Sequence, residues 1–188
     1  MTDNIFDKLA EKQTDRKDIY DGKILHVVLD DVLLPNGSPA KREVVLHNGA
    51  VCIVPITSDN KIIMERQFRY PFNEVIWEIP AGKIDKGETD PIGAAMRELR
   101  EETGYVAKEL IPIGEYYSSP AILSEKIYMY VAIDLCKGEQ ELDEDEFLDV
   151  TAIPFDDVVK MILDNEIPDG KTQAAVLKVK ALRELGMI

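Results

Sequence analysis

One helix is specified more completely than any other part of this sequence. Asp90 is a good N-cap, Pro91 suits the first helical position, and Gly104 suits the position just beyond the C-terminus. Between these signals, apolar or small side chains recur every three or four residues, at Ile92, Ala95, Met96, Leu99 and Thr103. The spacing predicts a helix over about 91–103 that buries one face against another element.

Strand-like segments surround this helix. Branched and aromatic residues are separated by turn signals such as Pro35-Asn36-Gly37 and Asp59-Asn60. Residues 1–21 are polar and are expected to form a short helix or arm. We expect strands at about 23–34, 42–46, 50–57, 61–68, 75–79, 110–117 and 126–134, and later helices at 155–165 and 171–185. Because no regular βαβ alternation is visible, the fold class is α+β or mixed-sheet α/β.

Composition excludes several classes of protein. Of the 188 residues, 45% are apolar, which is enough for a buried core and too much for a disordered chain. The longest apolar runs, such as 49–56, are far shorter than the ~20 residues that cross a bilayer. A net charge of −14 argues against non-specific binding to nucleic acids or anionic membranes.

The cysteines and the N-terminal residues suggest a compartment. Cys52 and Cys136 are too few for a disulfide framework, and neither has the spacing of a metal ligand. Residues 1–4 show no start of a secretory signal. We therefore expect a reducing, cytoplasmic setting.

The helix over 91–103 carries three carboxylates on neighbouring positions, Glu98, Glu101 and Glu102. Like charges at this spacing repel, and hard oxygen ligands held together in this way suit Mg²⁺ or Mn²⁺. The alternative is a solvated acidic face with Arg97 and Arg100 as local partners, and spacing alone does not favour either interpretation.

The residues around this helix resemble the Nudix box, G-x5-E-x7-R-E-U-x-E-E-x-G-U. Gly82 to Glu88 match its first part, and Arg97 to Tyr105 match its second part. Eight residues separate Glu88 from Arg97 where the family usually has seven, and Tyr105 occupies the last apolar position. We expect the extra residue at Thr89 to Pro91, before or at the start of the helix, which leaves the register of Arg97 to Glu102 intact.

The resemblance extends over roughly residues 40–180 and is closest to the ADP-ribose pyrophosphatase branch of the Nudix hydrolases. It is carried by 42–47, 65–69 and 77–82, and by Pro120, which follows Gly104 by sixteen residues and is itself followed by Glu125. Pro120 also has an ordinary interpretation as a turn residue.

The resemblance implies an α+β Nudix fold, a mixed-sheet α/β/α sandwich with an N-terminal antiparallel strand region. Residues 1–45 would form that region and 46–188 the hydrolase domain. The family further implies a homodimer in which the N-terminal strands of one subunit shape the site of the other.

The resemblance also implies a metal site. Glu98 and Glu102 would be the main ligands of Mg²⁺, with Mn²⁺ possible, Glu101 would be an auxiliary ligand, and the Ala81 carbonyl would be a further one. Arg97 would orient a glutamate by a charge-assisted hydrogen bond. Its alternative is an ordinary surface ion pair.

The general base in this branch comes from an acidic loop, which corresponds to residues 142–147. We expect Glu144 to be the base, with Glu146 as the alternative base or a further metal ligand. Arg69 is the first candidate for a phosphate contact and Arg42 a weaker one. Glu125 is a candidate for binding ribose hydroxyls. The alternative for each of these side chains is that it is solvated on the surface and has no role in the site.

The resemblance leads to three hypotheses about function. The first is Mg²⁺-dependent hydrolysis of ADP-ribose to AMP and ribose 5-phosphate by water, and the second is the same chemistry on another nucleoside diphosphate sugar. The third is a sensor that binds a nucleotide sugar without hydrolysing it, which the intact glutamate pattern argues against. Residues 85–102 and 139–149 carry ten of the fourteen surplus negative charges. The acidity is therefore concentrated at the expected metal helix and catalytic loop.

Overall fold

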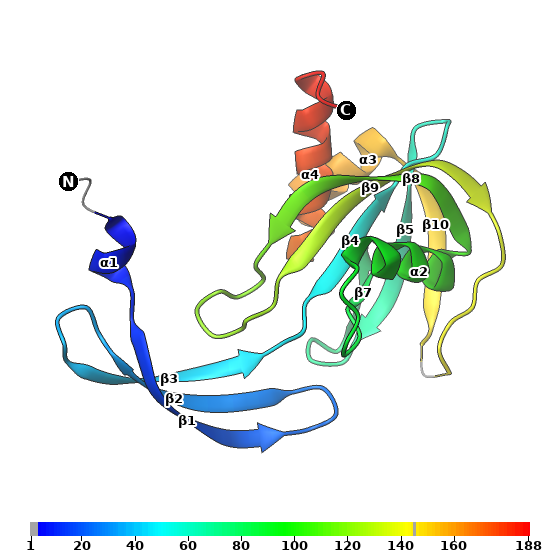
Figure 1. Cartoon of the computed structure of the whole chain (residues 1–188). Helices are drawn as coiled ribbons and strands as arrows, with labels where there is room; N and C mark the ends of the chain where they lie inside the picture. Colours follow the sequence, from blue (N-terminus) through cyan, green and yellow to red (C-terminus); the bar gives the residue numbers. More distant parts are fainter. Residues whose placement is uncertain (1–3, 145) are drawn as a thin grey trace. The chain divides into compact units, whose positions relative to one another are not determined.

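The computed structural model describes residues 4–144 and 146–188, so residues 1–3 and Asp145 of the acidic loop lie outside it. The chain forms two compact units, Met1–Asn48 with Ser119–Glu125, and Gly49–Ser118 with Lys126–Ile188. Figure 1 shows the course of the chain through both. None of the described helices is long and apolar enough to cross a membrane.

The first unit is a three-stranded antiparallel sheet preceded by a short helix, α1 (Ile5–Leu9). Its strands β1 (Lys12–Asp21), β2 (His26–Leu33) and β3 (Pro39–Leu46) pair in that order. The predicted turn at Pro35-Asn36-Gly37 joins β2 to β3, and Gly37 has φ +82°. The antiparallel character of this region is as predicted.

The prediction for residues 1–21 was wrong over β1, which is a strand. All ten of its residues are exposed, so it lacks the apolar alternation from which a strand is recognised. Pairing with β2 holds it instead, together with a bidentate ion pair in which Arg16 Nε and Nη2 each lie 2.7 Å from an oxygen of Asp30.

The second unit contains two sheets. Strands β4 (Ala50–Pro55), β7 (Ala81–Lys83), β8 (Tyr105–Tyr116) and β9 (Ile127–Lys137) form a mixed sheet of order β7-β4-β9-β8, in which β4 and β9 are parallel. Strands β5 (Lys61–Arg69), β6 (Glu74–Glu78) and β10 (Leu148–Pro154) form an antiparallel sheet of order β10-β5-β6.

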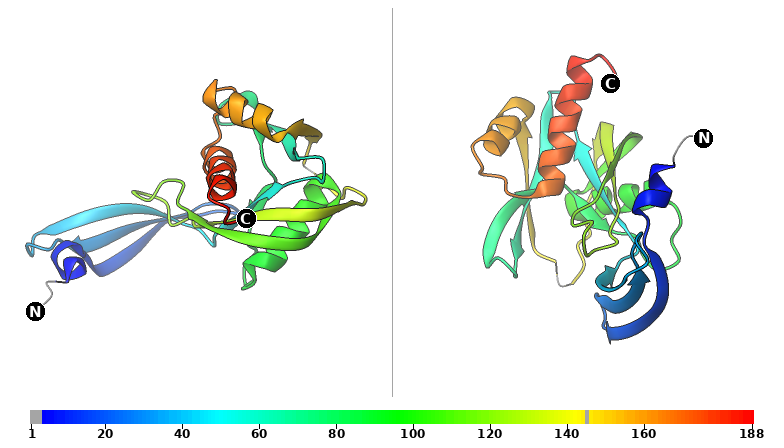
Figure 2. Two further views of the ribbon diagram at one scale, coloured as in Figure 1. Left: turned by 90° about the horizontal axis from the view of Figure 1, so that it is seen from above. Right: turned by 90° about the vertical axis from the view of Figure 1, so that its left-hand side faces the viewer.

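Strand β4 is buried at all six positions because helices cover both of its faces. Val51 and Ile53 join a core with α2 (Pro91–Thr103), whereas Cys52 and Val54 join a core with α3 (Phe155–Leu163) and α4 (Gly170–Glu184). Figure 2 shows α2 on one side of the mixed sheet and α3 and α4 on the other. This is the mixed α+β arrangement that was predicted.

The helix predicted over 91–103 is confirmed residue for residue. Asp90 Oδ1 accepts a hydrogen bond from the Ile92 N–H at 3.1 Å, and Gly104 ends α2 with φ +72°. Helix α2 is continuous from Pro91 to Thr103, so Arg97 to Glu102 follow one another on a regular helix.

Other boundaries differ from the prediction. Strand β8 begins at Tyr105, five residues before the predicted start, and β7 and β10 were not predicted. β7 has only three residues and contains Gly82, and β10 follows the acidic loop with little apolar alternation. Such short, weakly patterned strands are defined by their partners, β4 and β5.

Candidate active site

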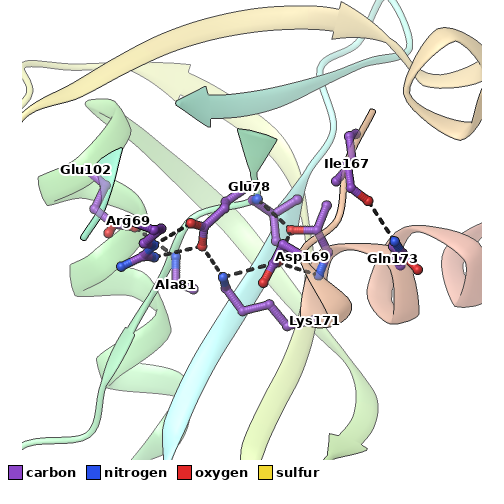
Figure 3. Close-up of polar contacts among 10 residues, drawn as sticks. Arg69, Glu78, Ala81, Glu102, Ile167, Asp169, Lys171 and Gln173 are labelled. Atoms are coloured by element: carbon purple, nitrogen blue, oxygen red, sulfur yellow. Dashed lines mark hydrogen bonds and ion pairs between the residues drawn. The ribbon is translucent and has the colours of Figure 1, made fainter. Parts of the chain in front are cut away.

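Two carboxylates of α2 are buried against β7, the short strand that precedes this helix along the chain. Glu98 is 9% exposed and Glu102 is 4% exposed. The Ala81 N–H donates a hydrogen bond of 2.8 Å to Glu102 Oε2 (Figure 3). A Cβ at position 82 would overlap the Glu98 carboxylate, so glycine at this position allows that carboxylate to lie directly against β7.

Arg97 hydrogen-bonds to two of the neighbouring acids of α2. Its Nη1 lies 2.8 Å from Glu98 Oε1 and 3.0 Å from Glu101 Oε2. Despite the extra residue, Glu88 also remains within reach, with its Oε2 3.7 Å from Arg97 Nη2. The structure therefore brings Arg97, Glu98 and Glu101 together on one side of the box.

A third buried carboxylate, Glu65, lies in the middle of β5 and was not singled out from the sequence. It is 1% exposed, and within the part of the chain that the structure describes its Oε2 has no hydrogen-bond partner. Its position opposite Glu78 in the β5–β6 ladder brings two carboxylates together. A signal was available, because Glu65 follows the apolar run Ile62-Ile63-Met64 inside a predicted strand.

Burial and mutual repulsion favour the protonated form of these acids. Burial raises the pKa of Glu98 to about 7 from an ordinary 4.5, against the opposing effect of Arg97. Burial also raises the pKa of Glu102, to which the charges of Glu65 and Glu98 add. The pKa of Glu65 is likewise raised, first by burial and then by Glu78. A bound cation would relieve this cost of ionisation.

The donor chemistry of the cluster fits a hard divalent cation, because every candidate ligand is an oxygen. In the present arrangement Glu102 binds the Ala81 N–H and Glu98 binds Arg97. Among residues 4–144 and 146–188, no three His, Cys, Asp or Glu side chains are arranged around one ion position. The fit to a metal therefore rests on the oxygen donors, their burial and the unpartnered Glu65 oxygen.

Arg69 lies at the end of β5 in a network of charges that the sequence did not reveal. Its Nε and Nη2 lie 2.5 Å and 2.7 Å from the two oxygens of Glu78, which also binds Lys171 of α4 (Figure 3). Burial would raise the pKa of Glu78, but these two cations together lower it. Glu78 is therefore an ionised, buried carboxylate held between Arg69 and Lys171.

The two glutamates of the acidic loop differ in their surroundings. Glu144 is exposed in a turn, whereas Glu146 is half-buried and its N–H donates to the Asp143 carbonyl at 3.0 Å. The charge of Glu146 raises the pKa of Glu65, Glu98 and Glu102. Glu146 thus lies within electrostatic reach of the buried acids.

The other three candidates belong to the first unit. Arg42 of β3 is bound by Glu11, with Nε 2.9 Å from Oε2. Pro120 lies in an exposed turn, and Glu125 Oε1 is 3.7 Å from His47 Nε2. The box carboxylates, Arg69 and Glu146 all belong to the second unit.

A cavity of about 400 Å³ in the second unit has a different lining, which includes Lys108, Cys136 and Arg183. It contains none of the box carboxylates and does not mark this site.

Comparison with known proteins assigns the chain to a family. Residues 46–175 match the NUDIX domain, and residues 11–45 match the nucleoside diphosphate sugar hydrolase N-terminal domain. The chain is 44% identical to an ADP-ribose pyrophosphatase of Bacillus subtilis (strain 168), over 89% of this chain and 91% of that protein. It is also 44% identical to a methanol dehydrogenase activator of Bacillus methanolicus, over 90% and 92% of the two chains.

A solved structure supports the same assignment. The crystal structure of an ADP compounds hydrolase superposes with a TM-score of 0.82 and 27% identity, covering 94% of this chain and 97% of that one. The match to the NUDIX domain spans more than half of the chain and includes the whole of the box. The chain therefore belongs to the Nudix hydrolase family.

Proposed function

We propose that this chain hydrolyses the pyrophosphate bond of ADP-ribose, giving AMP and ribose 5-phosphate, with Mg²⁺ as its metal ion. The observation that supports the chemistry is the group of buried carboxylates, Glu65, Glu98 and Glu102, of which the last two lie against β7. The choice of ADP-ribose is supported by relatives named ADP-ribose pyrophosphatase in Bacillus subtilis and, at 33% identity, Mycobacterium tuberculosis.

Nudix hydrolases generally use divalent metal ions, and the oxygen donors here favour Mg²⁺, with Mn²⁺ as the alternative. Glu98 and Glu102 are the proposed main ligands, with Glu101 and the Ala81 carbonyl as further ones. When bound, the ions supply neutralising charge for the pyrophosphate and acidify a water molecule. Arg97 fixes the orientation of Glu98 and Glu101 through its two hydrogen bonds.

A base from the acidic loop accepts the proton of the attacking water. The half-burial of Glu146 and its electrostatic effect on the box acids support Glu146 for this role, with the exposed Glu144 as the alternative. This reverses the order of preference that the sequence suggested.

Arg69 is the proposed phosphate-binding residue of the second unit. Its side chain remains 37% exposed although Glu78 holds one edge of the guanidinium. Arg42 as a weaker phosphate contact, Pro120 as a substrate-binding residue and Glu125 as a contact of the ribose hydroxyls stay predictions.

The proposed assembly is a homodimer formed through the N-terminal region, residues 1–45. Support comes from β1, which is exposed over its whole length and, in the described part of the chain, pairs only with β2. An open sheet edge of this length is a ready surface for another chain. The proposed compartment is the cytoplasm, which the exposed free thiol of Cys136 suits.

A phosphate-release screen tests the activity. The purified chain, Mg²⁺ and a coupled phosphatase are incubated with ADP-ribose, other nucleotide sugars, dinucleoside polyphosphates or nucleoside triphosphates. Turnover should be highest with ADP-ribose and should disappear with EDTA. GDP-mannose is included because the chain is 30% identical to a GDP-mannose pyrophosphatase of Yersinia pestis. A higher kcat/KM for GDP-mannose than for ADP-ribose would show that ADP-ribose is not the preferred substrate.

Activation of a methanol dehydrogenase is a second candidate function, favoured by the 44% identity to the Bacillus methanolicus activator. The test adds the chain and Mg²⁺ to a methanol dehydrogenase and measures methanol oxidation. An unchanged rate would exclude this function and leave the hydrolysis intact.

A further inference from the structure

Four charged side chains form a continuous chain of ion pairs from the end of β5 to the start of α4. Arg69 binds Glu78, Glu78 binds Lys171, and Lys171 Nζ lies 3.1 Å from Asp169 Oδ2 (Figure 3). The two positive and two negative charges balance. The network is therefore neutral as a whole, which makes its burial tolerable.

Only one member of this network faces solvent to a substantial extent. The side chain of Glu78 is 1% exposed, that of Lys171 is 12% exposed and that of Asp169 is 17% exposed, whereas 37% of Arg69 is exposed. The buried Glu78 and the half-buried Lys171 and Asp169 therefore support Arg69, the most exposed cation of the network.

The guanidinium of Arg69 is held by one edge. Glu78 occupies Nε and Nη2, and a guanidinium carries five N–H donors in a rigid fork. The opposite edge can then bind phosphate oxygens in a fixed direction, because rotation of the planar group would break both bonds to Glu78.

Lys171 is itself fixed by the first turn of α4. Asp169 Oδ2 accepts hydrogen bonds from the Thr172 N–H at 2.9 Å and from the Thr172 hydroxyl at 2.6 Å. The Thr172 hydroxyl in turn accepts the Ile79 N–H at 3.0 Å. The start of α4 is thus joined to two successive residues at the end of β6, Glu78 through its side chain and Ile79 through its backbone.

We propose that Lys171 is a positioning residue, which fixes the Glu78 carboxylate so that Glu78 holds the Arg69 guanidinium ready for a substrate phosphate. The inference rests on the proposed function, because it takes Arg69 as the phosphate-binding group. Lys171 acts through Glu78 and Arg69 without touching the substrate.

The test is a double-mutant cycle between Lys171 and Arg69. Lys171→Met, Arg69→Ala and the double variant are compared for kcat and KM with ADP-ribose. The same variants are compared for the dissociation constant of the ADP-ribose analogue whose bridging oxygen is replaced by a methylene group. Lys171→Met should raise KM and this dissociation constant by about tenfold and change kcat by less than about threefold. When Arg69→Ala is already present, Lys171→Met should have no further effect on KM or on the dissociation constant.

Three control variants separate positioning from folding. Lys180→Met removes an exposed lysine of the same helix, which pairs with Glu184 four residues on, and should leave KM unchanged. Lys171→Arg keeps the charge and should recover most of the binding. If Lys171→Met does not fold, Lys171→Gln keeps a hydrogen-bond donor and replaces it in the cycle.

The outcomes separate this inference from the proposed function. If Lys171→Met weakens binding equally with and without Arg69, or if only its Tm changes, the positioning role is wrong. If the wild-type chain binds the analogue through Arg69 and Lys171 but does not hydrolyse ADP-ribose, the proposed function fails and the positioning role stands. If the wild-type chain does not bind the analogue at all, the positioning role is overturned.

Discussion

Glu65 and Glu78 lie directly opposite each other in the β5–β6 ladder, yet only Glu78 is held by cations. Glu65 keeps an unpartnered oxygen within the described part of the chain, and its pKa is raised by burial and by Glu78. Two like residues in register thus have pKa values that are shifted in opposite directions, that of Glu65 upward and that of Glu78 downward. Glu78 supports Arg69, and Glu65 is left available on the side of the box acids.

Glu98 should make the stability of the metal-free chain depend on pH. Burial raises its pKa in the folded chain to about 7 from 4.5, so the folded chain holds this proton more tightly than the unfolded chain. The resulting stabilisation is fully present below about pH 4.5 and is lost as the pH rises through about 7. In EDTA, Tm should therefore fall over this range, and the fall should be smaller in Glu98→Gln.

Mg²⁺ provides the control for this measurement. With saturating Mg²⁺ the wild-type chain should gain Tm most at the upper end of the range, where Glu98 is ionised. The prediction fails if the wild type and Glu98→Gln give parallel pH profiles in EDTA.

Glu102→Gln should lower Mg²⁺-dependent turnover by about 10² or more, because the variant loses a proposed metal ligand. Its amide oxygen can still accept the Ala81 N–H, so the fold should persist. Circular dichroism and kcat measured over a range of Mg²⁺ concentrations would check this. Glu101→Gln, at a more exposed auxiliary position, should lose less than about tenfold. Unchanged turnover in Glu102→Gln would remove the metal assignment.

Gly82→Ala should reduce kcat/KM by about tenfold or more, because the added Cβ would overlap the Glu98 carboxylate and displace this proposed metal ligand. Gly93→Ala, in the same helix, is the matched control, since its nearest neighbour is the movable end of Asp90. Steady-state kinetics and Tm of both variants test this prediction. Equal activities would mean that the close approach at Gly82 is dispensable.

Substitution of the two loop glutamates, Glu144 and Glu146, should lower kcat to different extents. Glu146→Gln should lower kcat by about 10² with little change in ligand binding, since a general base acts on the chemical step. Glu144→Gln should retain most of the activity, because its side chain is exposed in a turn. Single-turnover rates and binding of the methylene analogue check both variants, and a loss confined to Glu144→Gln would return the role of base to that residue.

The helix of the box could be predicted to the residue because its signals are local. Asp90, Pro91 and Gly104 each act on the backbone within one turn of their own position. Strands β1 and β10 were missed for the opposite reason. Their residues carry little apolar alternation, and their conformation is set by β2 and β5, which are distant in sequence.

The same distinction separates the parts of the candidate site. Arg97, Glu98, Glu101 and Glu102 follow one another on a single helix, so their grouping is visible in the sequence. Glu78 and Lys171 are 93 residues apart, and their ion pair exists only because α4 packs beside the end of β6. No local pattern marks such a pair, although a lone acid such as Glu65 after an apolar run is a usable sign of a special site.

The complete burial of β4 has a consequence for how this unit can be divided. Val51 and Ile53 belong to the core formed with α2, and Ala50, Cys52 and Val54 belong to the core formed with α3 and α4, so both cores of the unit include β4. A fragment ending after α2 would keep β4 but leave one of its faces bare, and a fragment beginning after α2 would lack β4 altogether. The unit is therefore indivisible as a folding module, and its amides in β4 should be the last to exchange with solvent.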